Sequence, residues 1–488
     1  MKLSLEKARE LMASNGGTLD LRNSDYTILP DGLEVKRDLR IRDSRIAVLP
    51  GGLTIGRDLI IEDARITELP EDIRIGRNLI IKSKYFSDLP SKLYVAGDLY
   101  IDCQMVEEMP KKLEIGRDFY LNCPLVKKLP DDLHVGRDFN LKDASIKVMP
   151  KGLVVGRDFG FHQRGPVLMS KSMRIGRHID LSHVQMVALP EDMTCVNGSL
   201  ILCLAKIDVM PRGLTVKGDL NMNNSFITTL PDDLTVEHNL DISFSDLQTM
   251  PKGLKLGGSL NLSDTIIAEL PMDMTVVRSP DAIDSGLPDQ PHGLTIVGDL
   301  NLVDTQISAL PDHLTVGGNL EMGSFEDDLN FKYKSEYRGD KSGMVKITTM
   351  PNHLSVGGNL KLVNIPFTSL PDHISVGGDM KLLDYRSDET SKIKPIGSSL
   401  RLCRSLTEVV HGLPRKCNLS GAKLRFQPKS LHIGGNLDLS FMDIEALPAD
   451  LHVGGNLKLT YTQIRALPDN LRVGGDLDVS HTRLKEYR

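Results

Sequence analysis

The sequence predicts a repeat solenoid, a stack of about 23 short coils with a parallel β-sheet along one face. Proline carries the period: 19 of the 26 prolines recur every 20 residues between Pro30 and Pro468, with small shifts of frame near positions 200 and 400. Apolar residues keep fixed places relative to each proline, and glycines precede the main apolar run in most coils. Such a period is too short for a pair of helices and suits a strand with an extended or 3₁₀ return.

The N-terminal element is expected to be a short helix over residues 1–15, MKLSLEKARELMASN, which covers the first coil. Leu5, Ala8, Leu11 and Met12 form one apolar face, and Asn15-Gly16-Gly17 ends the helix. Charged residues interrupt any apolar core of a signal peptide. No run of about 18 apolar residues follows, so we expect no membrane span.

The repeating element is expected to contain one short strand. With the proline as position 0, positions 3, 5, 9, 11, 16 and 19 are apolar, and positions 9 to 11 alternate apolar and polar residues. This alternation predicts a strand with one buried face. Position 9, exemplified by Leu260, should point inward, because stacked coils about 4.8 Å apart can bury side chains that one coil cannot.

Residues 16–488 are expected to form one continuous array that follows the helical cap at 1–15, with degenerate repeats at 321–350 and 383–427. Irregular coils of this kind become surface loops or partner-binding insertions.

The composition of the chain argues against two classes of function. The 488 residues contain 59 Lys and Arg against 65 Asp and Glu, a net charge of −6, which argues against a general nucleic-acid binder. Hydrophobic residues make up 40% of the chain, enough for a core, whereas aromatic residues make up only 5% and Trp is absent, which is low for a compact enzyme.

The repeat unit L-x-L-x-x-[T/S/N]-x-[I/L]-x-x-L-P, found at 260–271, 300–311 and 457–468, resembles a leucine-rich repeat. The longer form LPxxLxVGGxLxLxxTxIxxLP is similar to the EspR-like type III secreted effectors of enteric bacteria. The resemblance implies a concave parallel sheet, binding of a host protein and secretion into the host cell cytoplasm. In one departure, Ser or Thr (Ser44, Thr265 and Thr305 among them) replaces the usual ladder Asn, which predicts a patchier ladder.

Catalytic and metal sites are not expected, and neither is a cofactor. His183 and Cys203 come close enough in the repeat frame to be considered as a nucleophile and base. His162, His178 and Asp180 lie with His183 in two neighbouring coils and are candidate metal ligands. These positions vary from coil to coil, so polar turn residues are the simpler interpretation. Cys103 and Cys123 occupy one position in successive coils and are expected to be small buried residues.

Two surface columns are candidates for binding a partner. In four successive coils, position 10 is occupied by Ile60, Ile80, Tyr100 and Tyr120, which form an apolar stripe about 14 Å long. Such a stripe can either bind a partner or only stabilise the sheet. Position 7 is a column of arginines beside a position-8 column rich in Asp, which suggests an ion-pair ladder or a surface for an acidic partner. The candidate partner-binding residues are Ile60, Ile80, Tyr100, Tyr120, Arg57, Arg77 and Arg117.

The leading hypothesis is a non-enzymatic scaffold that binds a protein partner, secreted as a bacterial virulence effector. The alternatives are a structural repeat protein of the bacterial cytoplasm or of a phage, and an enzyme with a site in 321–427.

Overall fold

A computed structural model describes residues 1–162, 166–270, 273–276, 293–323, 347, 350–363, 371–378, 380–383, 400–401, 428–440 and 444–484. The chain forms a leucine-rich-repeat solenoid of stacked parallel strands, which confirms the predicted fold class. It divides into two compact units, Met1–Ile227 and Thr228–Arg488. Within the part of the chain that the structure describes, no helix is long and apolar enough to cross a membrane.

The expected N-terminal helix is present as α1 (Leu5–Ser14). Ser4 caps it by accepting a hydrogen bond from the backbone N–H of Lys7 at 3.1 Å. Ala8 and Met12 are buried, whereas Leu5, which was expected on the same apolar face, is 37% exposed. Gly17 closes the helix with a positive φ of 92° and donates its N–H to the Met12 carbonyl at 2.7 Å.

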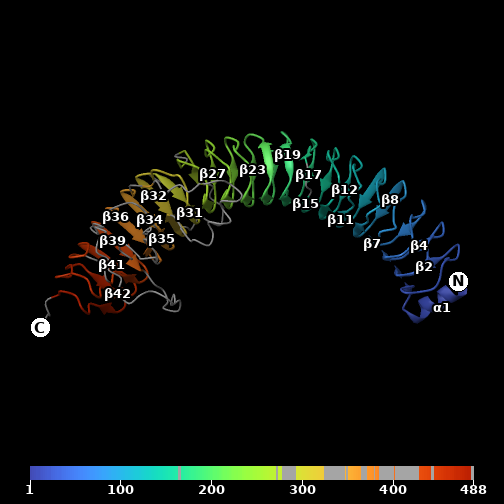
Figure 1. Cartoon of the computed structure of the whole chain (residues 1–488), viewed down its shortest axis with the longest axis horizontal. Coiled ribbons are helices and arrows are strands. Elements are labelled where there is room, and N and C mark those ends of the chain that lie inside the picture. The colour runs from blue at the N-terminus through green and yellow to red at the C-terminus, as the bar shows by residue number, and fades with distance from the viewer. Residues whose placement is uncertain are drawn as a thin grey trace, which may run out of the picture. The chain divides into compact units, whose positions relative to one another are not determined.

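The main ladder of the first unit pairs eleven parallel strands, each in register with the equivalent strand of the next coil. It lines the inner, concave side of this unit (Figure 1). The strands are β1 (Leu19–Asp20), β3 (Leu39–Arg42), β5 (Leu59–Glu62), β7 (Leu79–Lys82), β9 (Leu99–Asp102), β11 (Phe119–Asn122), β13 (Phe139–Lys142), β15 (Phe159–His162), β18 (Ile179–Asp180), β21 (Leu200–Ile201) and β24 (Leu220–Asn221).

Shorter parallel ladders form the other sides of the coils in the first unit. The first contains β2 (Glu34–Val35), β4 (Thr54–Ile55) and β6 (Arg74–Ile75), and the second β8 (Lys92–Val95), β10 (Lys112–Ile115), β12 (His134–Val135), β14 (Val154–Val155) and β17 (Arg174–Ile175). The others contain β16 (Pro166–Val167), β19 (Gln185–Ala188) and β22 (Lys206–Val209), and β20 (Cys195–Val196) with β23 (Thr215–Val216).

The second unit repeats this plan. Its main ladder contains β26 (Leu240–Asp241), β28 (Leu260–Asn261), β31 (Leu300–Val303), β33 (Leu320–Gly323), β35 (Leu360–Val363), β37 (Met380–Leu383), the antiparallel β38 (Leu400–Arg401), β40 (Leu437–Asp438), β42 (Leu457–Lys458) and β44 (Leu477–Asp478). Opposite it lie β25 (Thr235–Val236), β27 (Lys255–Leu256) and β29 (Thr275–Val276), and then β30 (Leu294–Ile296), β32 (His313–Val316), β34 (His353–Val356), β36 (His373–Val376), β39 (Ser430–Ile433), β41 (Asp450–Val453) and β43 (Arg472–Val473).

The core lies between the ladders and is built from the predicted apolar positions. Leu260 at position 9 is 1% exposed and pairs in register with Leu240 and Leu300, so the inward assignment of that position is confirmed. In the first unit, Phe119 and Phe139 stack face to face in the same column, with ring centroids 4.7 Å apart.

The glycines before the main strand are explained by close packing of the coils. Gly76 does not adopt a positive φ; instead, a Cβ there would lie 2.2 Å from the Gly56 carbonyl oxygen of the preceding coil. Close approach of stacked backbones therefore favours glycine at this position. The expected continuous array over 16–488 stays a prediction, since the segments 321–350 and 383–427 fall largely outside the described residues.

Candidate functional site

The apolar stripe, defined as Ile60, Ile80, Tyr100 and Tyr120, lies on four adjacent strands of the first unit, β5, β7, β9 and β11. Strand register places the four residues directly side by side on the concave ladder. All four side chains are half-buried, so each presents part of its surface to solvent. The sequence prediction that these residues form one stripe therefore holds in the structure as a matter of position, while its role in binding stays a prediction.

The two tyrosines form a compact aromatic pair. Their rings stack with centroids 4.3 Å apart and an interplanar angle of 11°. The Lys82 ammonium lies over the Tyr100 ring, 4.6 Å from its centroid, as a cation–π contact. Burial, followed by the neighbouring Tyr100, raises the pKa of Tyr120 to about 12, so this phenol stays protonated and able to donate a hydrogen bond at neutral pH. Because both faces of Tyr100 are covered, a partner would meet ring edges and hydroxyl groups.

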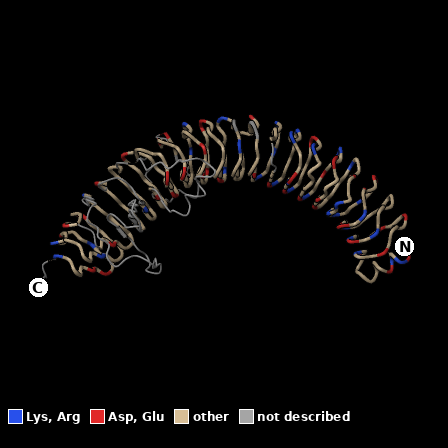
Figure 2. Tube along the Cα trace, viewed as in Figure 1, with Lys and Arg blue, Asp and Glu red and all other residues tan. Residues whose placement is uncertain are grey.

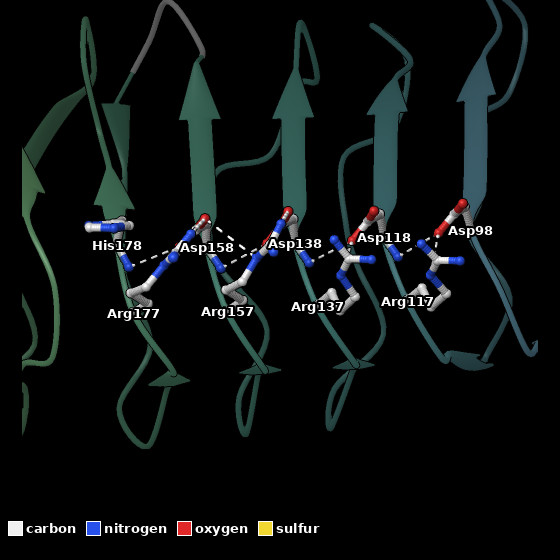
Figure 3. A network of polar contacts seen from close by, with 9 residues as sticks. All are labelled: Asp98, Arg117, Asp118, Arg137, Asp138, Arg157, Asp158, Arg177 and His178. Atoms are coloured by element: carbon white, nitrogen blue, oxygen red, sulfur yellow. Dashed lines mark hydrogen bonds and ion pairs between the residues drawn. The ribbon is translucent and has the colours of Figure 1, made fainter.

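A second column, at position 8, joins the coils through side chains that bond to the backbone. We call it the acidic ladder in the first unit (Figure 3). Asp138 shows the pattern: its Oδ1 accepts the backbone N–H of Asp158 one coil later at 3.2 Å. The same bond recurs in successive coils, with acceptors Asp58, Asn78, Asp98, Asp118, Asp158, His178 and Ser199 at 2.8–3.3 Å.

Position 8 is more than one half of an ion-pair ladder, because its first members are buried. Asp38 and Asp58 are only 5% and 9% exposed. Asp58 accepts the backbone N–H of Asn78 in the next coil at 3.2 Å, whereas Asp38 accepts hydrogen bonds from Thr18 and Arg40. The sequence analysis did not predict this role, because it assigned the ladder to the Ser and Thr positions. There, Thr265 and Thr305 bond the carbonyls of Leu262 and Leu302 in their own coil, at 2.7 and 3.0 Å.

Five arginines at position 7 pair diagonally with the acidic ladder, each with the carboxylate of the preceding coil: Arg77, Arg117, Arg137, Arg157 and Arg177. Arg77 donates from Nε to Asp58 at 2.8 Å, whereas Arg117 lies 3.5 Å from Asp98. Burial alone would raise the pKa of Asp58, but the bonds from Arg77 and from the Asn78 N–H hold it below its usual value. The predicted ion-pair ladder is thus present along part of the column, and it ties neighbouring coils together.

Arg57 differs from the other two candidate arginines. No carboxylate among the described residues lies within ion-pair distance of its guanidinium. Asp38 is the carboxylate of the preceding coil, and it contacts Arg40 instead, at 3.3 Å. The three arginines therefore do not form one equivalent set. Among the described residues Arg57 has no ion-pair partner, whereas Arg77 pairs with Asp58 and Arg117 with Asp98.

The far side of the stripe is bordered by position 12, where charge alternates from coil to coil. Glu62 lies 3.8 Å from Arg42 and 3.9 Å from Lys82, and Asn122 donates to Asp102 at 3.0 Å. Acidic and basic residues are accordingly interspersed along the first unit (Figure 2). The stripe is thus an apolar strip between two charged borders, the arrangement of a binding patch with an apolar centre and a polar rim.

Beyond the stripe, position 10 takes up a structural role that the sequence analysis did not identify. Asp180, Asp241 and Asn261 each accept the backbone N–H two residues later, at 3.0–3.2 Å. This local bond replaces the next rung of the sheet, and the strands that carry these residues, β18, β26 and β28, are two residues long. Strands β5 to β11 of the stripe are four residues long.

The catalytic and metal candidates are not brought together in a working geometry. The backbone N–H of His183 donates to the Cys203 carbonyl at 2.9 Å, and the Cys203 thiol lies 3.2 Å from the Asn221 side chain. His178 accepts a backbone N–H in the acidic ladder, and His162 lies 3.8 Å from Asp180. Cys103 and Cys123 are free thiols and fully buried, as expected.

Sequence reasoning also passed over His432, Asp450 and His452 in the second unit. Their donor atoms all lie within 4.8 Å of one another. The repeat frame could have identified them, since both histidines stand four residues after a repeat proline and Asp450 stands two residues after one.

Of the comparisons with known proteins, only the one with solved structures found a match. No protein-family model matches the chain, and neither does any curated protein. Among solved structures, the chain is similar to YopM from Yersinia enterocolitica WA-314, with 14% sequence identity, a TM-score of 0.33, and coverage of 99% of this chain and 93% of that one.

Proposed function

We propose that the chain is a non-enzymatic scaffold that binds a protein partner through the apolar stripe of its first unit. The observation that supports this most is the half-exposed run of Ile60, Ile80, Tyr100 and Tyr120 in one register column. Aromatic and branched apolar side chains that are exposed next to charged borders are typical centres of protein interfaces.

The borders of the stripe suggest the chemistry of the partner. Arg57 and, in part, Arg77 and Arg117 offer positive charge along one border, so a partner with an acidic rim is favoured there. Its centre would carry apolar side chains that pack against the two isoleucines and the tyrosine edges. The Tyr120 hydroxyl, protonated at neutral pH, would donate a hydrogen bond to a carbonyl or carboxylate of the partner.

The test measures partner binding by the double variant Tyr100→Ala and Tyr120→Ala. The partner is first obtained by affinity capture with the wild-type chain. If these tyrosines are hot spots, the variant should lose about 2 kcal/mol or more of binding free energy, roughly a 30-fold rise in Kd. The fold should tolerate the change, because the rings lie on the solvent side of the sheet.

The matched control is Asn140→Ala, the next residue of the same column, which pairs in register with Tyr120 and is exposed. It should bind normally. A second set, Val148→Asp with Leu168→Asp, places charge on an exposed apolar pair, 51% and 54% exposed, outside the stripe. Loss of binding from this second set, with none from the tyrosine pair, would refute the stripe as the interface.

We further propose that the chain is a secreted bacterial virulence effector, delivered to the host cell cytoplasm by a type III system, with a host protein as partner. The repeat form LPxxLxVGGxLxLxxTxIxxLP and its similarity to the effectors of enteric bacteria support this. A fusion of residues 1–50 to a translocation reporter tests the idea. A reporter signal in host cells that depends on a working secretion system is expected; a signal confined to the bacterium would favour a structural role there.

A further inference from the structure

The second unit holds a cluster of three metal-binding side chains on two adjacent strands. His432 lies on β39, and Asp450 and His452 lie on β41, with His432 and His452 directly paired in register. Backbone pairing therefore holds both imidazoles on the same face of the ladder, with ring centroids 4.6 Å apart and planes tilted by 41°. A site whose ligands stand on paired strands is positioned by the sheet itself.

The spacing of the donor atoms matches the edges of a small coordination sphere. The His432 Nε2 lies 3.5 Å from Asp450 Oδ2, and His452 Nδ1 lies 3.1 Å from Asp450 Oδ1. Two ligands of a tetrahedral zinc ion, each bound at about 2.0–2.1 Å, are separated by about 3.3 Å. Both observed distances are close to that value, and they involve the two different oxygens of the Asp450 carboxylate. With one ligand atom taken from each residue, all three atoms lie within 4.8 Å of one another.

The short contact between His452 and Asp450 is not a hydrogen bond. Although the two atoms lie 3.1 Å apart, the ring nitrogen has no hydrogen-bond partner and is shielded from solvent. The nitrogen and the carboxylate oxygen thus stand side by side without the alignment of a donor and an acceptor. Two metal ligands that point toward the same cation have this arrangement. Without a cation, a shielded nitrogen that has no hydrogen-bond partner would destabilise the fold.

We propose that His432, Asp450 and His452 bind a divalent transition-metal cation of the Zn²⁺ class. Two imidazole nitrogens and one carboxylate oxygen are a donor set that Zn²⁺ accepts, whereas Mg²⁺ and Ca²⁺ prefer oxygen donors throughout. The cation can approach from solvent past His432 and Asp450, whose side chains are each 44% exposed, and the shielded Nδ1 of His452 would bind it from the inner side. Water would complete the coordination at the fourth position.

Neighbouring side chains affect how strongly this site can bind a cation. Arg472 on β43 pairs in register with His452, so its positive charge opposes the cation, while Asp450 supplies the one negative charge among the ligands. The nearby column of His313, His353 and His373 differs, since its rings stack at 4.4 and 4.7 Å. Among the described residues, only the cluster around Asp450 brings three such donors together.

The test titrates the chelator-treated full-length chain with Zn²⁺ by calorimetry and with Co²⁺ by visible absorption. The wild type should bind one cation more tightly than any other in the chain, and its Co²⁺ form should show the intense d–d bands of tetrahedral coordination. His432→Gln with His452→Gln should weaken this binding at least about 100-fold and remove the bands, and Asp450→Asn should weaken it about 10- to 100-fold.

The matched control is His353→Gln with His373→Gln, which removes two histidines from the same face and should leave both readouts unchanged. Arg472→Gln removes no ligand and should tighten Zn²⁺ binding, because it deletes the opposing charge. Zn²⁺ should also raise the thermal transition of the wild type and leave that of the double His432/His452 variant unchanged. Equal losses from the two double variants, or a wild type without tetrahedral Co²⁺ bands, would overturn the proposal.

Discussion

The acidic ladder makes a quantitative prediction at Asp138, where a single carboxylate has two separable roles. Its Oδ1 accepts the backbone N–H of Asp158 at 3.2 Å, and both of its oxygens accept hydrogen bonds from Arg157. Asp138→Asn keeps an oxygen for the backbone and removes the charge. Asp138→Ala removes both interactions. Comparing the two variants therefore separates the backbone bond from the ion pair.

The expected magnitudes differ for the two roles. The Asp138 and Arg157 side chains are 30% and 40% exposed, and a pair this exposed contributes about 0–1 kcal/mol. A part-buried backbone N–H left without an acceptor costs about 1–3 kcal/mol. Asp138→Asn should therefore destabilise the surrounding coils by less than about 1 kcal/mol, and Asp138→Ala by about 2 kcal/mol.

Amide hydrogen exchange at Asp158, measured by mass spectrometry or NMR, reads this difference locally, which suits a repeat array whose coils can open separately. Asp138→Ala should accelerate exchange there by about 5- to 30-fold, and Asp138→Asn only slightly. The control is Glu114→Ala, an exposed carboxylate on β10, which should have no effect. Equal acceleration by the Asn and Ala variants would show that charge pairing, rather than the backbone bond, is the stabilising part of the ladder.

Three further predictions concern pH, the core and the thiols. Bonds from Arg157 and Arg177 hold the pKa values of Asp138 and Asp158 below the usual 3.8, so the stability that they contribute is present above about pH 4 and is lost as pH falls further. Thermal transitions between pH 3 and 6 should show this loss in the wild type and less of it in Asp138→Asn. Leu260→Asp should lower the stability by about 3–5 kcal/mol, because it buries an unpaired charge, and circular dichroism should show a lower thermal transition. The control Lys255→Asp, on the exposed side of β27, should change the transition little. Equal transitions for the two variants would contradict the inward assignment of position 9. Burial raises the pKa of Cys103 from 9.0 to about 11, so iodoacetamide at pH 8 should label it at least about 100-fold more slowly than the exposed Cys195, and similar rates in peptide mapping would contradict its burial.

The fold could be predicted from the sequence because its signal is repeated. One apolar side chain at position 9 says little, but the same position in coil after coil leaves few ways to bury them all, and Leu260 lies where that frame places it. The frame also placed Tyr100 beside Tyr120 without any structure. It did not predict that their rings stack at 4.3 Å, since side-chain rotation is not encoded in the period.

The acidic ladder could not be predicted, because the charge of an Asp just before a strand suggests a solvated side chain. Whether Asp138 faces water or the next coil depends on where the strand starts and on which backbone N–H groups are left without a partner. The diagonal pairing with Arg157 depends on the same offset of one coil. These are relations between coils, and the alternation within one coil carries no information about them.

The spacing of the apolar stripe constrains what can bind there. Neighbouring side chains of the column are about 4.8 Å apart, since they belong to adjacent strands. An extended peptide laid along the column presents same-face side chains about 6.6 Å apart and falls out of step within two coils. A helix presents one face every 5.4 Å, about one turn per coil, and keeps contact over the roughly 14 Å of the stripe. If the stripe binds a partner as proposed, an amphipathic helix aligned with the stack, apolar toward Ile80 and Tyr100 and acidic toward Arg57, is the element that fits best.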